Sequence, residues 1–212
     1  MKVKGVCHGV GINDADYKVG LKCPFYNTWS EMIRRGYSEN EKSRHEGYRD
    51  VSVCKEWHLF SNFKAWMEEQ PWEGNDLDKD ILAKGNLIYS PATCVFVPSY
   101  INTLLVTSKA IRGKWPLGVS LLKDQLKKGK LKVFRASIKN KRSKTKQKNL
   151  GHFTSAMDAH KAWQLAKYSV MCERLDEYSK DSSFNVHVFN AIKIRTIKLK
   201  LEAALDKETV SL

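Results

Sequence analysis

The sequence has no long apolar run. No stretch of roughly 18 apolar residues, the minimum for a transmembrane helix, occurs in the 212-residue chain. The first residues, Met-Lys-Val-Lys-Gly, also lack the apolar core of a signal peptide. We therefore expect a cytoplasmic protein that has no membrane partner.

Paired cysteines are missing too. The five cysteines are an odd number, and no two of them form a Cys-x-x-Cys pair. Scattered single cysteines in a reducing compartment are usually small buried residues. A zinc site made from Cys7, His8, Cys23 and Cys54 is conceivable, but zinc frameworks normally use short paired spacings, which argues against zinc.

Acidic residues are nearly absent from one segment. Residues 111–150 contain 14 Lys or Arg and a single acid, Asp124, so this segment has a charge of +13 in a chain of net charge +14. Residues 1–110 carry 14 basic and 14 acidic residues, and residues 151–212 carry 9 and 8. Such a block attracts polyanions by displacing their counterions, which favours nucleic acid over an anionic membrane or a merely solvated charged face.

The first half of the chain predicts helices followed by a small mixed unit. Apolar residues at helical spacing predict one helix from residue 25 to 37 and another from 57 to 67, separated by a loop over 38–52. Residues 74–98 then contain polar turns and one short apolar strand at 94–98. A helix from Ser99 to about Lys109 follows, and residues 111–116 predict a linker.

The second half predicts three strands packed on a helix. In residues 133–139, Phe134, Ala136 and Ile138 face one way, while Val133, Arg135, Ser137 and Lys139 face the other. A Lys-rich hairpin over 140–148 follows, and Ser155-x-x-Asp158 predicts the start of the helix. A strand face carrying Arg and Lys is a geometry that can enter the DNA major groove. Residues 192–201 fit either a helix or a strand.

Several spaced motifs in this half carry a family resemblance. They are Gly118-Val119-Ser120, the strand from Lys130 to Ile138, Leu150-Gly151-His152-Phe153-Thr154 and the Ala-rich stretch from Ala159 to Lys167. The segment resembles the AP2 DNA-binding domain. The resemblance implies a three-stranded antiparallel sheet on one helix, with the basic face of the sheet on duplex DNA. The DNA contacts it implies are Arg135, Ser137 and Lys139, with Ser120, Lys130, Lys132, Lys146 and Lys148 as further candidates.

The first half also resembles a known family. The matching residues are Tyr26, Trp29, Met32, Arg35 and Tyr37; Val53, Cys54, Trp57, Phe60 and Phe63; Leu77, Asp78, Lys79 and Asp80; and Gly85, Asn86, Tyr89, Ser90, Pro91 and Cys94. They resemble the phage HNH homing endonucleases, some of which carry a C-terminal AP2 domain. The resemblance implies a phage or mobile-element origin and the cytoplasm of a bacterial or phage-infected host cell.

The HNH resemblance implies a ββα site that holds one Mg²⁺ or Mn²⁺ ion on the scissile phosphate. It assigns Asp78 as the metal carboxylate, with Asp80 as a near alternative, and it gives Asn86 the role of tying the hairpin together. Lys79 stands where the family has its general-base His, and Thr93 stands where a second metal-binding Asn is expected. Lys79 would then stabilise phosphate charge while Tyr89 serves as the base, and Thr93 would be a weak hydroxyl ligand. The alternative is that Asp76, Asp78 and Asp80 only form a polar turn that caps and solubilises the hairpin.

Together these patterns predict an α+β protein. We expect an HNH-like domain at 1–110 with a ββα hairpin, a linker at 111–116, an AP2-like domain at 117–178 and a helical extension at 179–212. The leading hypothesis is a metal-dependent DNA endonuclease. The alternatives are an HNH-derived DNA-binding regulator without catalysis, which the missing His and Asn favour, and an RNA-binding or protein-interaction module. The sequence does not decide whether the chain is a monomer or a homodimer.

Overall fold

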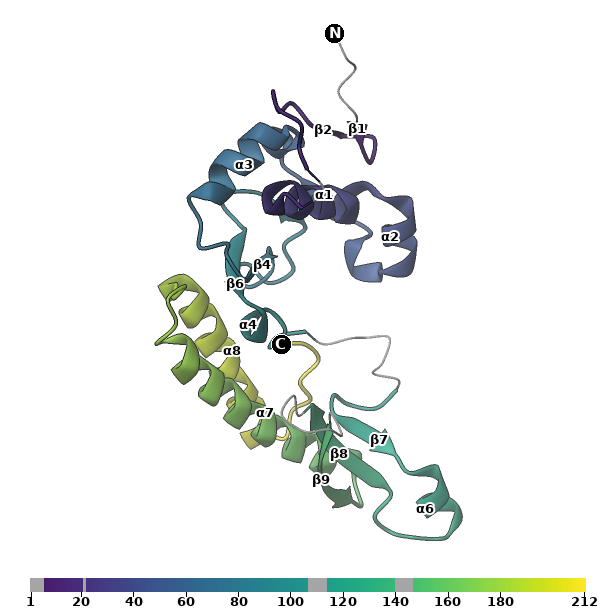
Figure 1. Cartoon of the computed structure of the whole chain (residues 1–212). Coiled ribbons are helices and arrows are strands. Elements are labelled where there is room, and N and C mark those ends of the chain that lie inside the picture. Colours follow the sequence, from purple (N-terminus) through teal and green to yellow (C-terminus); the bar gives the residue numbers. More distant parts are fainter. Residues whose placement is uncertain (1–5, 21, 107–113, 140–146) are drawn as a thin grey trace. The chain divides into compact units, whose positions relative to one another are not determined.

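Two compact units make up the chain. A computed structural model describes residues 6–20, 22–106, 114–139 and 147–212, and the chain divides into Met1–Asn102 and Thr103–Leu212. Helices and small sheets occur in both units, which confirms the expected α+β class (Figure 1). No helix in the described part of the chain is long and apolar enough to cross a bilayer. The first half of the linker expected at 111–116, residues 111–113, lies outside the described residues.

The N-terminal unit is built from short elements around an aromatic core. The strands pair as β1 with β2, β3 with β5 and β4 with β6. Its elements are β1 (Val6–Cys7), β2 (Gly11–Ile12), α1 (Pro24–Tyr37), α2 (Glu39–Arg44), the 3-10 turn η1 (Glu46–Tyr48), β3 (Ser52–Val53), the 3-10 turn η2 (Lys55–His58), α3 (Phe60–Glu68), β4 (Asn75–Asp78), β5 (Ile88–Tyr89), β6 (Val95–Pro98) and α4 (Ser99–Asn102).

The apolar stripes predicted from the sequence form this core. Trp29 of α1 and Trp57 of η2 are buried together with Phe60 and Phe63 of α3. The indole nitrogen of Trp29 donates a hydrogen bond to the carbonyl of Trp57 at 2.8 Å, so burial leaves this polar atom satisfied. Pro24 stands at the start of α1, where its missing N–H costs nothing. The core thereby fixes α1 and α3 against the strands that follow.

A ββα arrangement closes the N-terminal unit. Strand β4 pairs antiparallel with β6, with Asp78 opposite Val95, and α4 follows β6 directly and packs on both strands. The helix expected to run from Ser99 to about Lys109 instead ends at Asn102, because residues 103–106 turn away from helical geometry. The loop expected at 38–52 also contains a short helix, α2, whose Glu41 is paired with Arg34 of α1.

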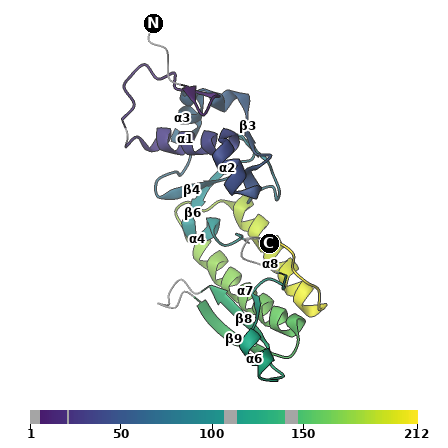
Figure 2. The ribbon, with the colours of Figure 1, turned by 90° about the vertical axis from the view of Figure 1, so that its right-hand side faces the viewer.

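The C-terminal unit is a three-stranded sheet packed on a helical hairpin. The sheet has the antiparallel order β7-β8-β9, with α7 packed on it and α8 packed on α7 (Figures 1 and 2). The Ser155 hydroxyl accepts hydrogen bonds from the N–H groups of Met157 and Asp158, which confirms the predicted start of α7. The elements are β7 (Val119–Leu121), α6 (Lys123–Lys127), β8 (Phe134–Lys139), β9 (Gln147–Phe153), α7 (Ala156–Tyr178) and α8 (Val186–Ala204).

The structure of this unit decides two predictions, the conformation of residues 192–201 and the position of Val133. Residues 192–201 lie within α8, so they form a helix and not a strand. Ile192, Thr196 and Leu199 are buried on one face of this helix, which packs on α7. The expectation that Val133 lies on the outer face of the sheet is wrong, since this residue is buried just before β8, where its carbonyl accepts the Leu122 N–H. The Lys-rich hairpin expected over 140–148 falls mostly outside the described residues.

Candidate functional site

Asp78 stands at the last position of β4, where the ββα loop begins. Its Oδ1 accepts hydrogen bonds from the N–H groups of Asp80 at 2.7 Å and Ile81 at 2.6 Å. Burial raises the pKa of this carboxyl, and the two N–H donors oppose that shift. Within the described residues no hydrogen bond reaches Oδ2. The backbone therefore orients the carboxylate and leaves one oxygen available.

Lys79 is directed inward, with 5% of its surface exposed. Its ammonium group donates to both carboxylate oxygens of Asp80 at 2.8 Å and to the carbonyl of Asn86 at 2.8 Å. An ammonium group has three N–H donors, and these three contacts occupy all of them. The structure therefore ties Lys79 and Asp80 to each other and to the loop, and Lys79 presents no free group to a phosphate.

Asn86 closes the loop that follows Asp78. Its amide nitrogen donates to the carbonyls of Lys79 at 3.0 Å and Ile88 at 2.7 Å, and its side-chain oxygen accepts from the Ile88 N–H. Gly85 precedes it with φ of 78°, a left-handed conformation that favours glycine. The geometry matches the hairpin-tying role that the resemblance gave to Asn86.

Tyr89 lies in β5 and is 3% exposed. Burial raises the pKa of its phenol to about 12, although Arg35 of α1 lowers it in part. The Lys79 ammonium lies 5.8 Å from the ring centre of Tyr89. A buried phenol with this pKa stays protonated at neutral pH, which makes it a poor general base.

Thr93 lies in the turn before β6. Its hydroxyl donates to the carbonyl of Ile88 at 2.8 Å and lies 2.9 Å from the Ser90 hydroxyl. These bonds hold the turn against β5. The hydroxyl oxygen keeps acceptor capacity, so the residue retains the option of a weak ligand.

Asp78 is the side chain near β4 that could hold a divalent ion. Among the described residues no three His, Cys, Asp or Glu side chains gather as a metal-binding group. Mg²⁺ is often bound through one or two carboxylates, with waters and substrate phosphates completing its shell. The available Oδ2 of Asp78 fits that mode, whereas the oxygens of Asp80 are engaged by Lys79.

A second group of residues forms a row across the sheet of the C-terminal unit. Strand pairing places Ser120 of β7 opposite Arg135 of β8, and Arg135 opposite His152 of β9. The guanidinium Nε of Arg135 donates to the Ser120 hydroxyl at 3.3 Å. Neighbouring Val119 and Ala136 belong to the core under α7, so this row lies on the opposite, outer face.

The register of β9 changes after a bulge between Ala136 and Ser137. Beyond it, Ser137 pairs with Asn149, Ile138 with Lys148 and Lys139 with Gln147. Directly paired residues point to the same side of a sheet. Lys148, one of the further candidate contacts, therefore shares the side of buried Ile138, while Gln147 and Asn149 lie on the outer face beside Ser137 and Lys139.

Sequence reasoning missed His152, Asn149 and Gln147 as outer-face residues. Side chains normally alternate between the two faces along a strand, but the bulge inserts one extra residue into β9. Simple alternation along β9 therefore assigns the residues on one side of the bulge to the wrong face. Gly151 carried the available signal, since a glycine inside a strand often marks a bulge and this one has φ of 131°. Lys130 and Lys132 are exposed in the loop before β8, and Lys146 lies outside the described residues.

Comparison with known protein families, curated proteins and solved structures finds no match for this chain. The two resemblances therefore rest on the residues themselves. The structure adds a β-β-α order around Asp78 and a three-stranded antiparallel sheet on a helix.

Proposed function

We propose that the chain binds duplex DNA through the outer face of the β7-β8-β9 sheet. The observation that carries this proposal is the row Ser120, Arg135 and His152, which presents polar side chains from three strands of one sheet. The first two of these strands lie in the basic segment 111–150. Arginine pairs with the edge of guanine in the major groove, and a sheet face of this kind fits that groove. The exposed lysines before β8 would contact phosphates.

The salt dependence of binding tests this proposal. Gripping about six phosphates gives a slope of log K against log salt near −5. A slope near zero would mean that the basic segment does not contact phosphates. Competition with an RNA duplex of equal length checks the class of nucleic acid, because the deep and narrow major groove of RNA does not admit a sheet.

We further propose that the N-terminal unit hydrolyses a phosphodiester bond of the bound DNA. Asp78 would hold one Mg²⁺ or Mn²⁺ ion, with Thr93 as a weak additional ligand. Such an ion neutralises charge on the phosphate and on the leaving oxygen. The protein's own part is to orient the Asp78 carboxylate with two backbone N–H groups and to keep the loop closed through Lys79 and Asn86.

A specific observation favours a second function, DNA binding without cleavage. Lys79 has its three donors engaged, and Tyr89 is buried with a pKa of about 12, so neither residue offers a ready base. A chain that kept the ββα scaffold for binding alone would act as a repressor, a replication factor or an antagonist of a rival element. Cleavage of plasmid DNA in the presence of Mg²⁺ separates the two functions.

A further inference from the structure

Helix α8 is apolar on two sides. Val188, Ile192 and Leu199 are buried on the side of α8 that packs on α7. On the solvent side, Ile194, Ile197 and Leu201 recur at spacings of three and four residues, and their exposed fractions are 67%, 49% and 56%. Residues spaced in this way lie on one face of a helix. Exposed apolar residues gathered on one helical face are a feature that interaction surfaces share.

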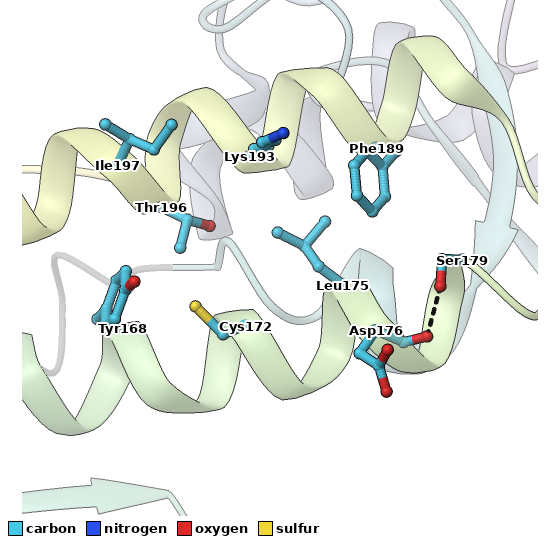
Figure 3. Close-up of a pocket in the computed structure, with 9 residues that line it drawn as sticks. All are labelled: Tyr168, Cys172, Leu175, Asp176, Ser179, Phe189, Lys193, Thr196 and Ile197. Carbon is cyan, nitrogen blue, oxygen red and sulfur yellow. Dashed lines mark hydrogen bonds between the residues drawn. The ribbon is translucent and has the colours of Figure 1, made fainter.

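The stripe borders a groove between α7 and α8. The groove has a volume of about 360 Å³, and Figure 3 shows Leu175 of α7 and Phe189 of α8 pointing towards each other within it. Ile197 belongs to both the groove and the stripe, so the two form one apolar surface. We call this surface the hairpin face. A groove of this kind between two helices accepts the apolar side chains of a third helix.

Charge on the hairpin face differs between its two helices. Lys193 lines the groove from α8, and Lys200 stands over the Tyr168 ring at 5.1 Å. Asp176 lines the groove from α7 and makes an ion pair with Lys180 that is exposed on both sides, so it exchanges easily. The α8 side is thus basic, and the α7 side offers a carboxylate.

We propose that a second copy of this chain docks on the hairpin face. A two-fold axis parallel to the helices places α7 of each copy over α8 of the other, which brings Asp176 of one copy towards Lys193 of the second. Packing α8 on α8 would instead bring the lysines of the two copies together. The result is a four-helix bundle whose interface is self-complementary in apolar surface and in charge. This inference is independent of any DNA-binding role.

The first test is the mass in solution, measured by light scattering after gel filtration. The wild-type chain is expected at twice 24.3 kDa at concentrations up to about 100 µM, where association of micromolar Kd is saturated. Ile197→Glu is expected to run as a monomer with unchanged far-UV circular dichroism. The control Leu131→Glu, at an exposed residue away from the hairpin, is expected to remain a dimer. A monomeric wild type, or a dimer that Ile197→Glu leaves intact, would overturn the proposal.

A charge exchange tests the arrangement of the helices. Asp176→Lys and Lys193→Glu each place like charges together twice in a homodimer, so each variant alone is expected to dissociate at least tenfold more readily. An equimolar mixture of the two variants restores both contacts with opposite charges, and is expected to form a heterodimer. Failure of the mixture to associate while the wild type is a dimer would overturn the packing of α7 over α8.

Discussion

At the scale of single residues, most polar side chains of the loop after β4 form hydrogen bonds within the loop. Lys79, Asn86 and Thr93 each bond to backbone carbonyls within the loop. Asp78 differs, because its backbone contacts engage one oxygen and burial opposes its ionisation. Buried carboxyls held at a cost to stability are typical of functional sites.

Asp78→Asn is expected to stabilise the protein at neutral pH. The pKa of Asp78 is higher in the folded protein than in the unfolded chain. The protonated carboxyl therefore adds its full contribution to the free energy of unfolding below the pKa of a free Asp, and this contribution is lost as pH rises through the pKa of the folded state. The amide keeps an oxygen for the two N–H donors and removes the charge. Thermal melts should therefore show the largest gain near pH 7 and a shrinking gain towards pH 4. A destabilised variant at pH 7 would contradict the role given to burial.

At the scale of elements, α7 meets the sheet at a glycine. Gly118 has φ of 78°, and a Cβ at this position would lie 2.0 Å from Cδ1 of Trp163. The indole of Trp163 thus lies against bare backbone just before β7. This contact fixes the distance between the helix and the strand that begins the outer row.

Gly118→Ala is expected to unfold or strongly destabilise the C-terminal unit, at a cost of about 3 kcal/mol or more, because strain and overlap with Trp163 add together. Gly129 provides a matched control: its φ is 65°, and a Cβ added there would meet nothing within 4 Å. Gly129→Ala should cost only about 1 kcal/mol, from strain alone. If urea denaturation showed the same loss in the free energy of unfolding for both variants, overlap with Trp163 would not contribute to the cost of Gly118→Ala.

The outer face of the sheet leads to a second element-level prediction. Arg135→Ala should cost ~1–3 kcal/mol in DNA affinity and relax specificity at one base position. Lys139→Ala should weaken all sequences alike and reduce the salt slope by about one. Lys148→Ala should change binding less than Lys139→Ala, because β9 places Lys148 on the side of Ile138. The reverse order, measured by fluorescence anisotropy, would contradict the register.

At the scale of the whole molecule, the sequence predicted an acid-bearing domain over 1–110 and a basic sheet domain from residue 117, whereas the chain divides after Asn102. Periodic patterns also predicted α1, α3, β6, β8 and the start of α7, because long apolar stripes and a capping box are local signals. The end of α4 and the buried Val133 were not predictable, since each depends on pairing or packing with distant residues. The bulge in β9 had one local signal, Gly151. The residue types of the candidate site could be recognised in the sequence. That Lys79 bonds to Asp80 and Asn86, and that Tyr89 is buried, could be seen only in the folded structure.

The most direct measurement is a supercoiled-plasmid assay with Mg²⁺ or Mn²⁺, using DNA from the neighbourhood of the gene. Wild type should convert supercoiled plasmid to open or linear forms. Asp78→Asn should lose at least about a hundredfold in rate while still binding DNA, because the oxygen that would hold the ion loses its charge. Glu73→Ala, at an exposed acid in the same unit, should cleave as wild type does. No cleavage by wild type with either metal, with DNA binding intact, would contradict the nuclease and leave DNA binding as the function.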